Sequence, residues 1–123
     1  MTRVLVVDDA QTVRLYHREL LEQDGFQVEE AVNGLEALER LADTPYDLLL
    51  VDVNMPRMDG YTLVRRVRED SSDPGVPVIM VTTEGAATDR EQALRAGANL
   101  HVVKPVQPEA LLFQVRLMSG ALS

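Results

Sequence analysis

The chain has 123 residues, enough for one hydrophobic core and too few for two domains of ordinary size. Its 46% hydrophobic and 26% charged content is typical of a globular domain, and the absence of cysteine excludes disulfides, thiol catalysis and cysteine-based metal sites. A net charge of −8 disfavours direct binding to nucleic acid, whose phosphates a negative surface repels. The apolar run Val4–Val7 is too short for a signal peptide or a membrane span. We therefore expect one cytoplasmic domain, residues 1–123, without membrane insertion.

Five short segments rich in apolar and β-branched residues are predicted to form β-strands. We interpret each as a near-continuous apolar run, which is typical of parallel strands covered by helices on both faces. In chain order the predicted strands are Arg3–Val7, Gln27–Val32, Asp47–Asp52, Val78–Thr82 and Leu100–Val103.

Segments with helical periodicity follow the strands. Asp24–Gly25 is expected to end the first, Asn33 to cap the second and Asp59–Gly60 to start the third. The fourth, from about Thr88 to Ala96, is rich in alanine and is closed by Gly97. The apolar positions at helical spacing in the other four are Val13, Tyr16, His17 and Leu20; Leu35, Leu38 and Leu41, expected to form an inner face; Leu63, Val64 and Val67; and Leu111, Leu112, Val115 and Met118.

This alternation of strand and helix predicts a doubly wound α/β sandwich with right-handed crossovers. Ligands of such folds bind beyond the carboxyl ends of the strands, at the topological switch point. Polar residues end or directly follow four of the predicted strands there: Asp8 and Asp9, Asp52, Thr82 and Lys104. Each alone could be a helix cap or a solvent-exposed charge. Their convergence at one edge instead favours a functional site, and Lys104 is the only lysine among 12 basic residues.

Such a cluster of carboxylates requires a counter-charge. Two carboxylates about 4 Å apart repel by roughly 4 kcal/mol at an effective dielectric near 20. Oxygen ligands without histidine or cysteine suit Mg²⁺, which takes one or two carboxylates, waters and a phosphate oxygen. Lys104 and Thr82 could then bind further oxygens of an anion, and Asp52 could act as the nucleophile. The residues together predict charge-stabilised phosphoryl transfer.

At this point the chain resembles a known family, the bacterial response-regulator receiver domain, and within it the single-domain chemotaxis-type receivers. The resemblance depends on Asp8–Asp9, the run from Val51 to Gly60, Thr82 and Lys104–Pro105, in that order and in the same elements. It covers essentially the whole chain. It implies a flavodoxin-like (βα)5 sandwich with a five-stranded parallel sheet in the order 2-1-3-4-5.

The resemblance also implies roles in a two-component phosphorelay. Asp52 would accept a phosphoryl group from a histidine kinase, a phosphotransfer protein or acetyl phosphate. Asp9 would bind Mg²⁺ directly, Asp8 would hold it partly through water, and Asn54 would add its backbone carbonyl. Thr82 and Lys104 would hold the phosphoryl oxygens. Such a protein assists its own phosphorylation and dephosphorylation and is not an enzyme acting on a separate substrate.

Further positions are implied in the same way. The Lys104–Pro105 peptide bond is expected to be cis. Asn54 and Glu84 stand where chemotaxis-type receivers carry the same residues, which tune hydrolysis of the acyl phosphate; Glu84 could equally be a surface charge.

Two positions depart from the family's usual pattern. His101 replaces the usual Tyr or Phe of the switch, and Thr83 a residue that is more often small. His101 is expected to turn inward when Thr82 moves toward the phosphoryl group, the alternative being a partly exposed edge residue without a switching role. Its imidazole would make that step sensitive to pH.

The output is expected on the face formed by the fourth helix, the fifth strand and the fifth helix, to which a downstream protein would bind. The loop from Thr83 to Ala87 is the candidate for the element that phosphorylation biases. The fourth helix, with alanine on its apolar side, should bury little and move easily. The Met1 start and the short tail favour a stand-alone regulator, with a receiver cut from a longer regulator as the alternative.

Four other classes are less consistent with the sequence. A haloacid-dehalogenase-type phosphatase carries Asp-x-Asp after its first strand, whereas here Asp52–Val53–Asn54 lies on the third. A flavodoxin-like electron carrier would need aromatic residues to enclose a flavin, and this chain has two Phe, three Tyr and no Trp. A P-loop nucleotidase is excluded because the only lysine lies outside the required motif. A pseudo-receiver that binds partners without phosphorylation is disfavoured because no motif residue is missing.

Overall fold

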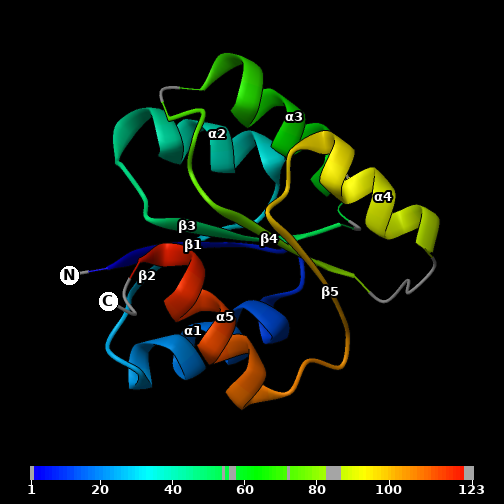
Figure 1. Ribbon diagram of the computed structural model, residues 1–123. Helices are drawn as coiled ribbons and strands as arrows, with labels where there is room; N and C mark the ends of the chain where they lie inside the picture. The colour runs from blue at the N-terminus through cyan, green and yellow to red at the C-terminus, as the bar shows by residue number, and fades with distance from the viewer. Residues whose placement is uncertain (1, 54, 56–57, 72, 83–86, 121–123) are drawn as a thin grey trace.

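The computed structural model describes residues 2–53, 55, 58–71, 73–82 and 87–120. Five strands alternate with five helices along the chain (Figure 1). The elements are β1 (Arg3–Val7), α1 (Gln11–Gln23), β2 (Gln27–Ala31), α2 (Gly34–Asp43), β3 (Leu48–Asp52), α3 (Gly60–Asp70), β4 (Val78–Thr82), α4 (Ala87–Ala96), β5 (Leu100–Val103) and α5 (Pro108–Ser119). No helix among the described residues is long and apolar enough to cross a lipid bilayer.

The strands form one sheet in the order β2-β1-β3-β4-β5, and every neighbouring pair is parallel. The predicted doubly wound topology is confirmed. In Figure 1, α2, α3 and α4 cover one face of the sheet, and α1 and α5 cover the other. The strand order reverses direction between β1 and β3, so the carboxyl ends of these two strands mark the switch point of the sheet.

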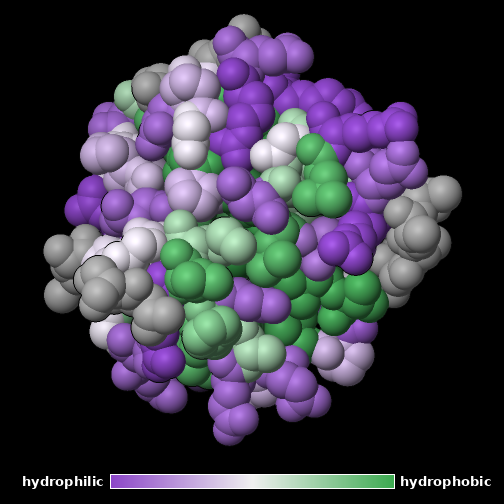
Figure 2. Space-filling view, in the orientation of Figure 1, coloured by the Kyte–Doolittle hydropathy of each residue, from purple (hydrophilic) through white to green (hydrophobic). Residues whose placement is uncertain are grey.

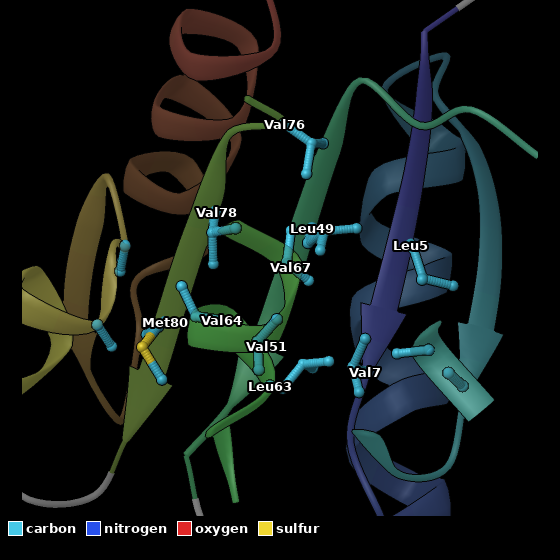
Figure 3. Close-up of a cluster of buried hydrophobic side chains, with 14 of the residues drawn as sticks. Leu5, Val7, Leu49, Val51, Leu63, Val64, Val67, Val76, Val78 and Met80 are labelled. Atoms are coloured by element: carbon cyan, nitrogen blue, oxygen red, sulfur yellow. The ribbon is translucent and has the colours of Figure 1, made fainter. Parts of the chain in front are cut away.

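Each face of the sheet carries its own hydrophobic core. On the side of α2, α3 and α4, side chains from β1, β3 and β4 pack against Leu63, Val64 and Val67 of α3 (Figure 3). On the opposite side, Leu21 of α1 and Leu111 of α5 pack against the alternate residues of the same strands. Burial on both faces explains the continuous apolar runs of β3 and β4, all of whose residues are buried.

The helix boundaries follow local chemistry that the sequence already indicates. The side chain of Asn33 caps α2 by accepting a hydrogen bond from the N–H of Glu36 at 2.8 Å. Asp59 does the same for α3, accepting from the N–H of Thr62 at 2.9 Å. Each such cap is worth about 1 kcal/mol. Helix α1 ends where expected, because Gly25 adopts a φ of 94° that other residues rarely tolerate.

Two predicted apolar faces differ in part from the structure. In α2, Leu41 is buried and Leu38 packs against the core, as expected. Leu35 was expected on the inner face of α2 but is 45% exposed, and the buried residues of the helix are Gly34, Ala37 and Leu41. Helix α2 lies so close to Met58 that a Cβ on Gly34 would be 2.8 Å from its sulfur, which leaves no room for a side chain at this position. The first helix differs in a similar way.

In α1, Tyr16 is 48% exposed although it shares the helical spacing of the apolar positions. Leu21, which the predicted set did not contain, is fully buried instead, together with His17. The apolar face of α1 is therefore rotated toward Leu21.

Strand β2 also differs from the expectation of a continuous apolar run. It is an edge strand, paired only with β1, and its Glu29 and Glu30 are half-buried. Salt bridges with arginines accommodate both glutamates: Arg3 and Arg40 approach Glu29, while Arg14 and Arg18 bind Glu30. Strand β2 is therefore apolar in part and ionic in part.

Arg68 at the end of α3 holds the turns at the amino ends of β4 and β5. Its guanidinium donates hydrogen bonds to the carbonyls of Gly97, Pro74 and Val76 and to Oδ1 of Asn99, at distances of 2.6 to 3.0 Å. Helix α4 is lightly packed by comparison. Ala93 and Ala96 are its buried side chains among those described, which agrees with the prediction that this helix buries little.

Candidate functional site

Three carboxylates meet at the carboxyl edge of the sheet, at the predicted switch point. Asp52 is the last residue of β3, and Asp8 and Asp9 directly follow β1. Because β1 and β3 are neighbours, with Val7 opposite Val51, these residues are placed side by side. One oxygen of each of the three carboxylates lies within 4.8 Å of the others. Asp8 and Asp52 are buried, whereas Asp9 is exposed.

The surroundings of Asp8 hold it firmly. Its Oδ1 accepts a hydrogen bond from the N–H of Ala10 at 2.9 Å, and its own N–H donates to the carbonyl of Ala31 at 3.1 Å. Burial raises the pKa of the Asp8 carboxyl, and it outweighs the opposing hydrogen bond from Ala10 and the charge of Lys104. An ionised carboxylate in this position is therefore costly in the absence of a further cation.

Lys104 supplies one positive charge to this cluster. Its Nζ lies 3.6 Å from Oδ1 of Asp52 and 4.0 Å from Oδ2 of Asp8. The lysine immediately follows β5, and its backbone N–H donates to the carbonyl of Thr82 at 2.7 Å. The Lys104–Pro105 peptide bond is cis, the form that the family resemblance implies.

Thr82 completes the set of residues predicted at this edge. It is the last residue of β4 and is fully buried. Strand β4 is paired with β3 so that Asp52 lies opposite Val81, and Thr82 is thus one residue beyond the level of Asp52. The five residues Asp8, Asp9, Asp52, Thr82 and Lys104 therefore gather at one edge, from four different strands.

His101 lies on the same face of the sheet as Thr82. It is opposite Met80, which is two residues before Thr82 on β4, and paired residues of parallel strands share a face. The imidazole is half-buried. The remaining predicted positions, Asn54, Thr83 and Glu84, lie outside the described residues.

Gly60 positions the end of β3. A Cβ at this position would lie 2.6 Å from the carbonyl oxygen of Asp52, 2.8 Å from Cε of Met80 and 2.9 Å from Cα of Val53. The N–H of Gly60 also donates to the carbonyl of Val53 at 2.9 Å. The start of α3 is thus packed directly against the backbone of Asp52, which explains why a glycine follows the cap residue Asp59.

Arg14 contacts the site, but the sequence did not identify it. Its Nη1 donates to the carbonyl of Asp8 at 2.7 Å, and its Nε donates to Oε1 of Glu30 at 3.0 Å. The available signal was the pair Arg14 and Arg18, one helical turn apart, opposite an acidic strand. Recognising it would have required knowing that α1 packs beside β2.

A cavity of about 460 Å³ lies between α1 and the segment that follows β5. Its lining residues are Val13, Tyr16, His17, Lys104, Pro105 and Val106. Burial lowers the pKa of His17 to about 4, with a further contribution from the charge of Lys104. His17 is therefore a buried neutral histidine close to the lysine of the site.

The cluster has the donor set of a magnesium site. Three carboxylates whose oxygens approach within 4.8 Å, with no histidine or cysteine among them, suit a hard divalent cation. The raised pKa of Asp8 points the same way, because a bound cation would compensate the buried charge.

Comparison with known proteins agrees with the site. Residues 4–116 match the family model of the response regulator receiver domain. The chain is 41% identical over 120 residues to chemotaxis protein CheY1 of Helicobacter pylori, covering 96% of this chain and 97% of that protein.

Solved structures are similar over the same extent. Chemotaxis protein CheY4 of Vibrio cholerae superposes with a TM-score of 0.90 at 36% identity, covering 96% of this chain and 98% of that one. The receiver domain of the sensor histidine kinase PA1611 of Pseudomonas aeruginosa, with a magnesium ion in its active site cleft, superposes with a TM-score of 0.88 at 28% identity, covering 97% and 98%. This chain belongs to the response regulator receiver domain family.

Proposed function

We propose that Asp52 is the phosphoacceptor of this receiver, and that it takes a phosphoryl group from a histidine kinase, a phosphotransfer protein or acetyl phosphate. One observation carries the proposal: the Asp52 carboxylate lies within 4.8 Å of two other carboxylates and 3.6 Å from the ammonium of Lys104. A carboxylate placed in this way can react as a nucleophile while neighbouring groups balance the charge of the incoming phosphoryl group.

The reaction is a displacement at phosphorus. An oxygen of Asp52 forms a new P–O bond, and the bond from phosphorus to the donor's imidazole nitrogen, or to the acetate oxygen, breaks. The leaving group keeps the bonding electron pair, and a histidine leaving group takes up a proton to become neutral. Lys104, whose Nζ is 3.6 Å from Oδ1 of Asp52, would pair with one phosphoryl oxygen, and Thr82 would donate its hydroxyl to another.

Mg²⁺ is the proposed cofactor. Asp8, Asp9 and Asp52 would hold it, and Asn54 would contribute its backbone carbonyl. The ion would neutralise the negative charge that accumulates between the carboxylates and the phosphoryl oxygens. The chain's own contribution is to keep Asp8 buried and hydrogen-bonded to Ala10, so that the carboxylates face one another before the ion arrives.

The proposed response to phosphorylation involves Thr82 and His101. Movement of Thr82 toward the phosphoryl group would vacate space on the face that it shares with His101, and the imidazole would turn inward. Asn54 and Glu84 are proposed to tune hydrolysis of the aspartyl phosphate. Comparing His101→Tyr and His101→Ala in phosphorylation-dependent partner binding tests the switch; unchanged binding in both variants would contradict it.

A downstream protein is proposed to bind the face formed by α4, β5 and α5. Apolar surface gathers over β5 and α5 in Figure 2, with hydrophilic surface around it. Val103, Phe113 and Leu117 contribute exposed apolar side chains to these elements, and Leu94 contributes one from α4. The likeness to two proteins named for chemotaxis favours that pathway, in a cytoplasmic single-domain regulator.

Intact-mass measurement tests the central proposal. The wild type is incubated with acetyl phosphate, with and without Mg²⁺, beside Asp52→Ala. We expect the mass of one phosphoryl group on the wild type in the presence of Mg²⁺ and none on the variant. A wild type that gains no mass, or a variant that gains it equally, would show that Asp52 is not the phosphoacceptor.

A further inference from the structure

We propose that Arg14 is a positioning residue for the metal site, because its guanidinium ties the carbonyl of Asp8 to the carboxylate of Glu30 on β2. This inference rests on the proposed function of the acidic cluster as a Mg²⁺ site. Arg14 would not contact the metal ion itself. It would act through the peptide unit that joins Asp8 to Asp9.

The guanidinium of Arg14 bridges two elements. Nη1 donates to the carbonyl oxygen of Asp8 at 2.7 Å, and Nε donates to Oε1 of Glu30 at 3.0 Å. The side chain is only 11% exposed. Both hydrogen bonds are thus largely shielded from water, where a charged donor contributes more than it does at the surface.

Glu30 is itself fixed from the other side. Its second oxygen accepts a hydrogen bond from Nη1 of Arg18 at 2.7 Å, and Arg18 also pairs with Glu22 at 3.3 Å. Burial opposes ionisation of Glu30, but the hydrogen bonds from Arg18 and Arg14 outweigh it, so its pKa lies below the usual value. Glu30 is therefore an ionised and immobilised anchor for Arg14 at neutral pH.

The carbonyl that Arg14 binds belongs to the peptide unit between Asp8 and Asp9, and so bears on the relative orientation of these two residues. Strand β1 ends at Val7, so the peptide between Asp8 and Asp9 lies beyond the strand. That peptide unit is planar, and fixing its oxygen fixes its plane and the direction in which the chain enters Asp9. The side chain of Asp9 is exposed, so packing contributes little to its orientation. The hydrogen bond from Arg14 to the Asp8 carbonyl would orient Asp9 instead.

Charge alone predicts the opposite effect of removing Arg14. A guanidinium close to a cation site repels the cation. Arg14 also lowers the pKa of Asp8, which would favour metal binding, but this is the smallest of the influences on that pKa. Arg14→Met would therefore bind Mg²⁺ more tightly if Arg14 acted only through its charge. Weaker binding would identify positioning as the dominant contribution.

A second arginine, whose side chain is 39% exposed, provides the control. Arg116 of α5 forms a bidentate pair with Asp24 at the end of α1, through Nε at 2.7 Å and through Nη2. Like Arg14, it links α1 to a neighbouring element, but it has no contact with the acidic cluster. Arg116→Met thus removes the same kind of side chain and the same charge without touching the Asp8 carbonyl.

The test measures the dissociation constant for Mg²⁺ by isothermal titration calorimetry on unphosphorylated protein, together with the melting temperature without metal. We expect Arg14→Met to weaken Mg²⁺ binding about tenfold, as is typical for residues that orient metal ligands. Glu30→Gln, which keeps its shape but loses its charge, should weaken binding less. Arg116→Met should lower the melting temperature while the dissociation constant stays within about twofold of the wild type.

The rate of phosphorylation by acetyl phosphate provides the second measurement. At saturating Mg²⁺ the rate of Arg14→Met should return to that of the wild type, because only the metal affinity is impaired. Wild-type Mg²⁺ affinity in both Arg14→Met and Glu30→Gln, or a rate defect that persists at saturating Mg²⁺, would overturn the positioning role alone. A wild type that binds no Mg²⁺ would overturn the proposed metal site and this inference together.

Discussion

The ammonium of Lys104 lies between the two buried carboxylates, 3.6 Å from Oδ1 of Asp52 and 4.0 Å from Oδ2 of Asp8. One side chain that follows β5 therefore neutralises part of the charge at the ends of β1 and β3. Under the proposed function, the same position would make Lys104 a competitor of the metal ion before phosphorylation and a partner of the phosphoryl group during it.

Lys104→Met should consequently have opposite effects on two measurements. Mg²⁺ binding by the unphosphorylated protein should tighten about fivefold, because a positive charge near the ion is removed. Phosphorylation by acetyl phosphate at saturating Mg²⁺ should slow, because one oxygen of the phosphoryl group loses its partner. Calorimetry and time-resolved intact mass provide the two values.

Arg95→Met controls for net charge, since Arg95 is on the surface of α4 and pairs with Glu91. A fivefold change in that variant as well would attribute the effect on Mg²⁺ to overall charge and not to the position of Lys104.

Asp8→Asn should stabilise the metal-free protein. A carboxyl whose pKa is raised in the folded state contributes stability at low pH and loses it as the pH rises through that value, so at neutral pH the ionised Asp8 is destabilising. Asparagine keeps the oxygen that accepts from Ala10 and removes the charge. We expect the melting temperature to rise by a few degrees at pH 7, and the stabilisation by added Mg²⁺ to be largely lost.

Asp9→Asn removes an equal charge from an exposed side chain and should change the melting temperature less. Equal changes in melting temperature for the two variants would contradict the claim that the buried, ionised Asp8 destabilises the metal-free protein.

Gly60→Ala should destabilise the fold and impair phosphorylation together. The added Cβ would lie 2.6 Å from the carbonyl oxygen of Asp52, so the end of β3 must move. Overpacking of this kind costs about 2 kcal/mol, more than the gain of up to about 1 kcal/mol from replacing glycine in a helix. Urea unfolding and the phosphorylation rate measure the two effects.

Gly75→Ala is the matched control, because a Cβ at Gly75 meets nothing within 4 Å. Its free energy of unfolding should stay within about 0.5 kcal/mol of the wild type. Equal stabilities of the two variants would mean that Gly60 can shift without disturbing Asp52.

His17→Gln should reduce the dependence of stability on pH. The pKa of His17 is lowered to about 4 in the folded state, chiefly by burial, from an unfolded value of 6.5. Between these values the unfolded chain binds a proton that the folded chain does not, so stability falls as the pH decreases. The loss across this window is about 3 kcal/mol for the wild type.

Glutamine does not titrate, so the difference in unfolding free energy between the wild type and His17→Gln should change by about that amount between pH 7.5 and pH 4. Parallel curves for the two proteins across this range would show that His17 is not buried in its neutral form.

The location of the site could be predicted because it depends on topology. In a parallel α/β sheet the carboxyl ends of the strands lie at one edge, so the order of elements alone assigned Asp8, Asp52 and Thr82 to that edge. The strand order that makes their strands neighbours was implied by the family resemblance and is found in the structure. The caps at Asn33 and Asp59 were equally predictable, because a cap is a local interaction within one turn.

The orientation of helices was less predictable, because it depends on what each helix packs against. Leu35 has the periodicity of an inner residue, but Gly34, which packs against Met58, lies on the inner face of α2 with Ala37 and Leu41 instead. The role of Arg14 depends on a contact across 16 residues with Glu30, and no local pattern specifies such a pair. Long-range ion pairs of this kind become visible only when the packing of α1 against the sheet is known.

The glutamates of β2 have one more consequence, which concerns association between molecules. An edge strand offers unpaired backbone groups to which a strand of another chain could add. On β2 this addition would bring further chains against Glu29 and Glu30, which are already engaged by arginines of α1, α2 and β1. The charged strand is thus expected to disfavour strand pairing at this open edge of the sheet.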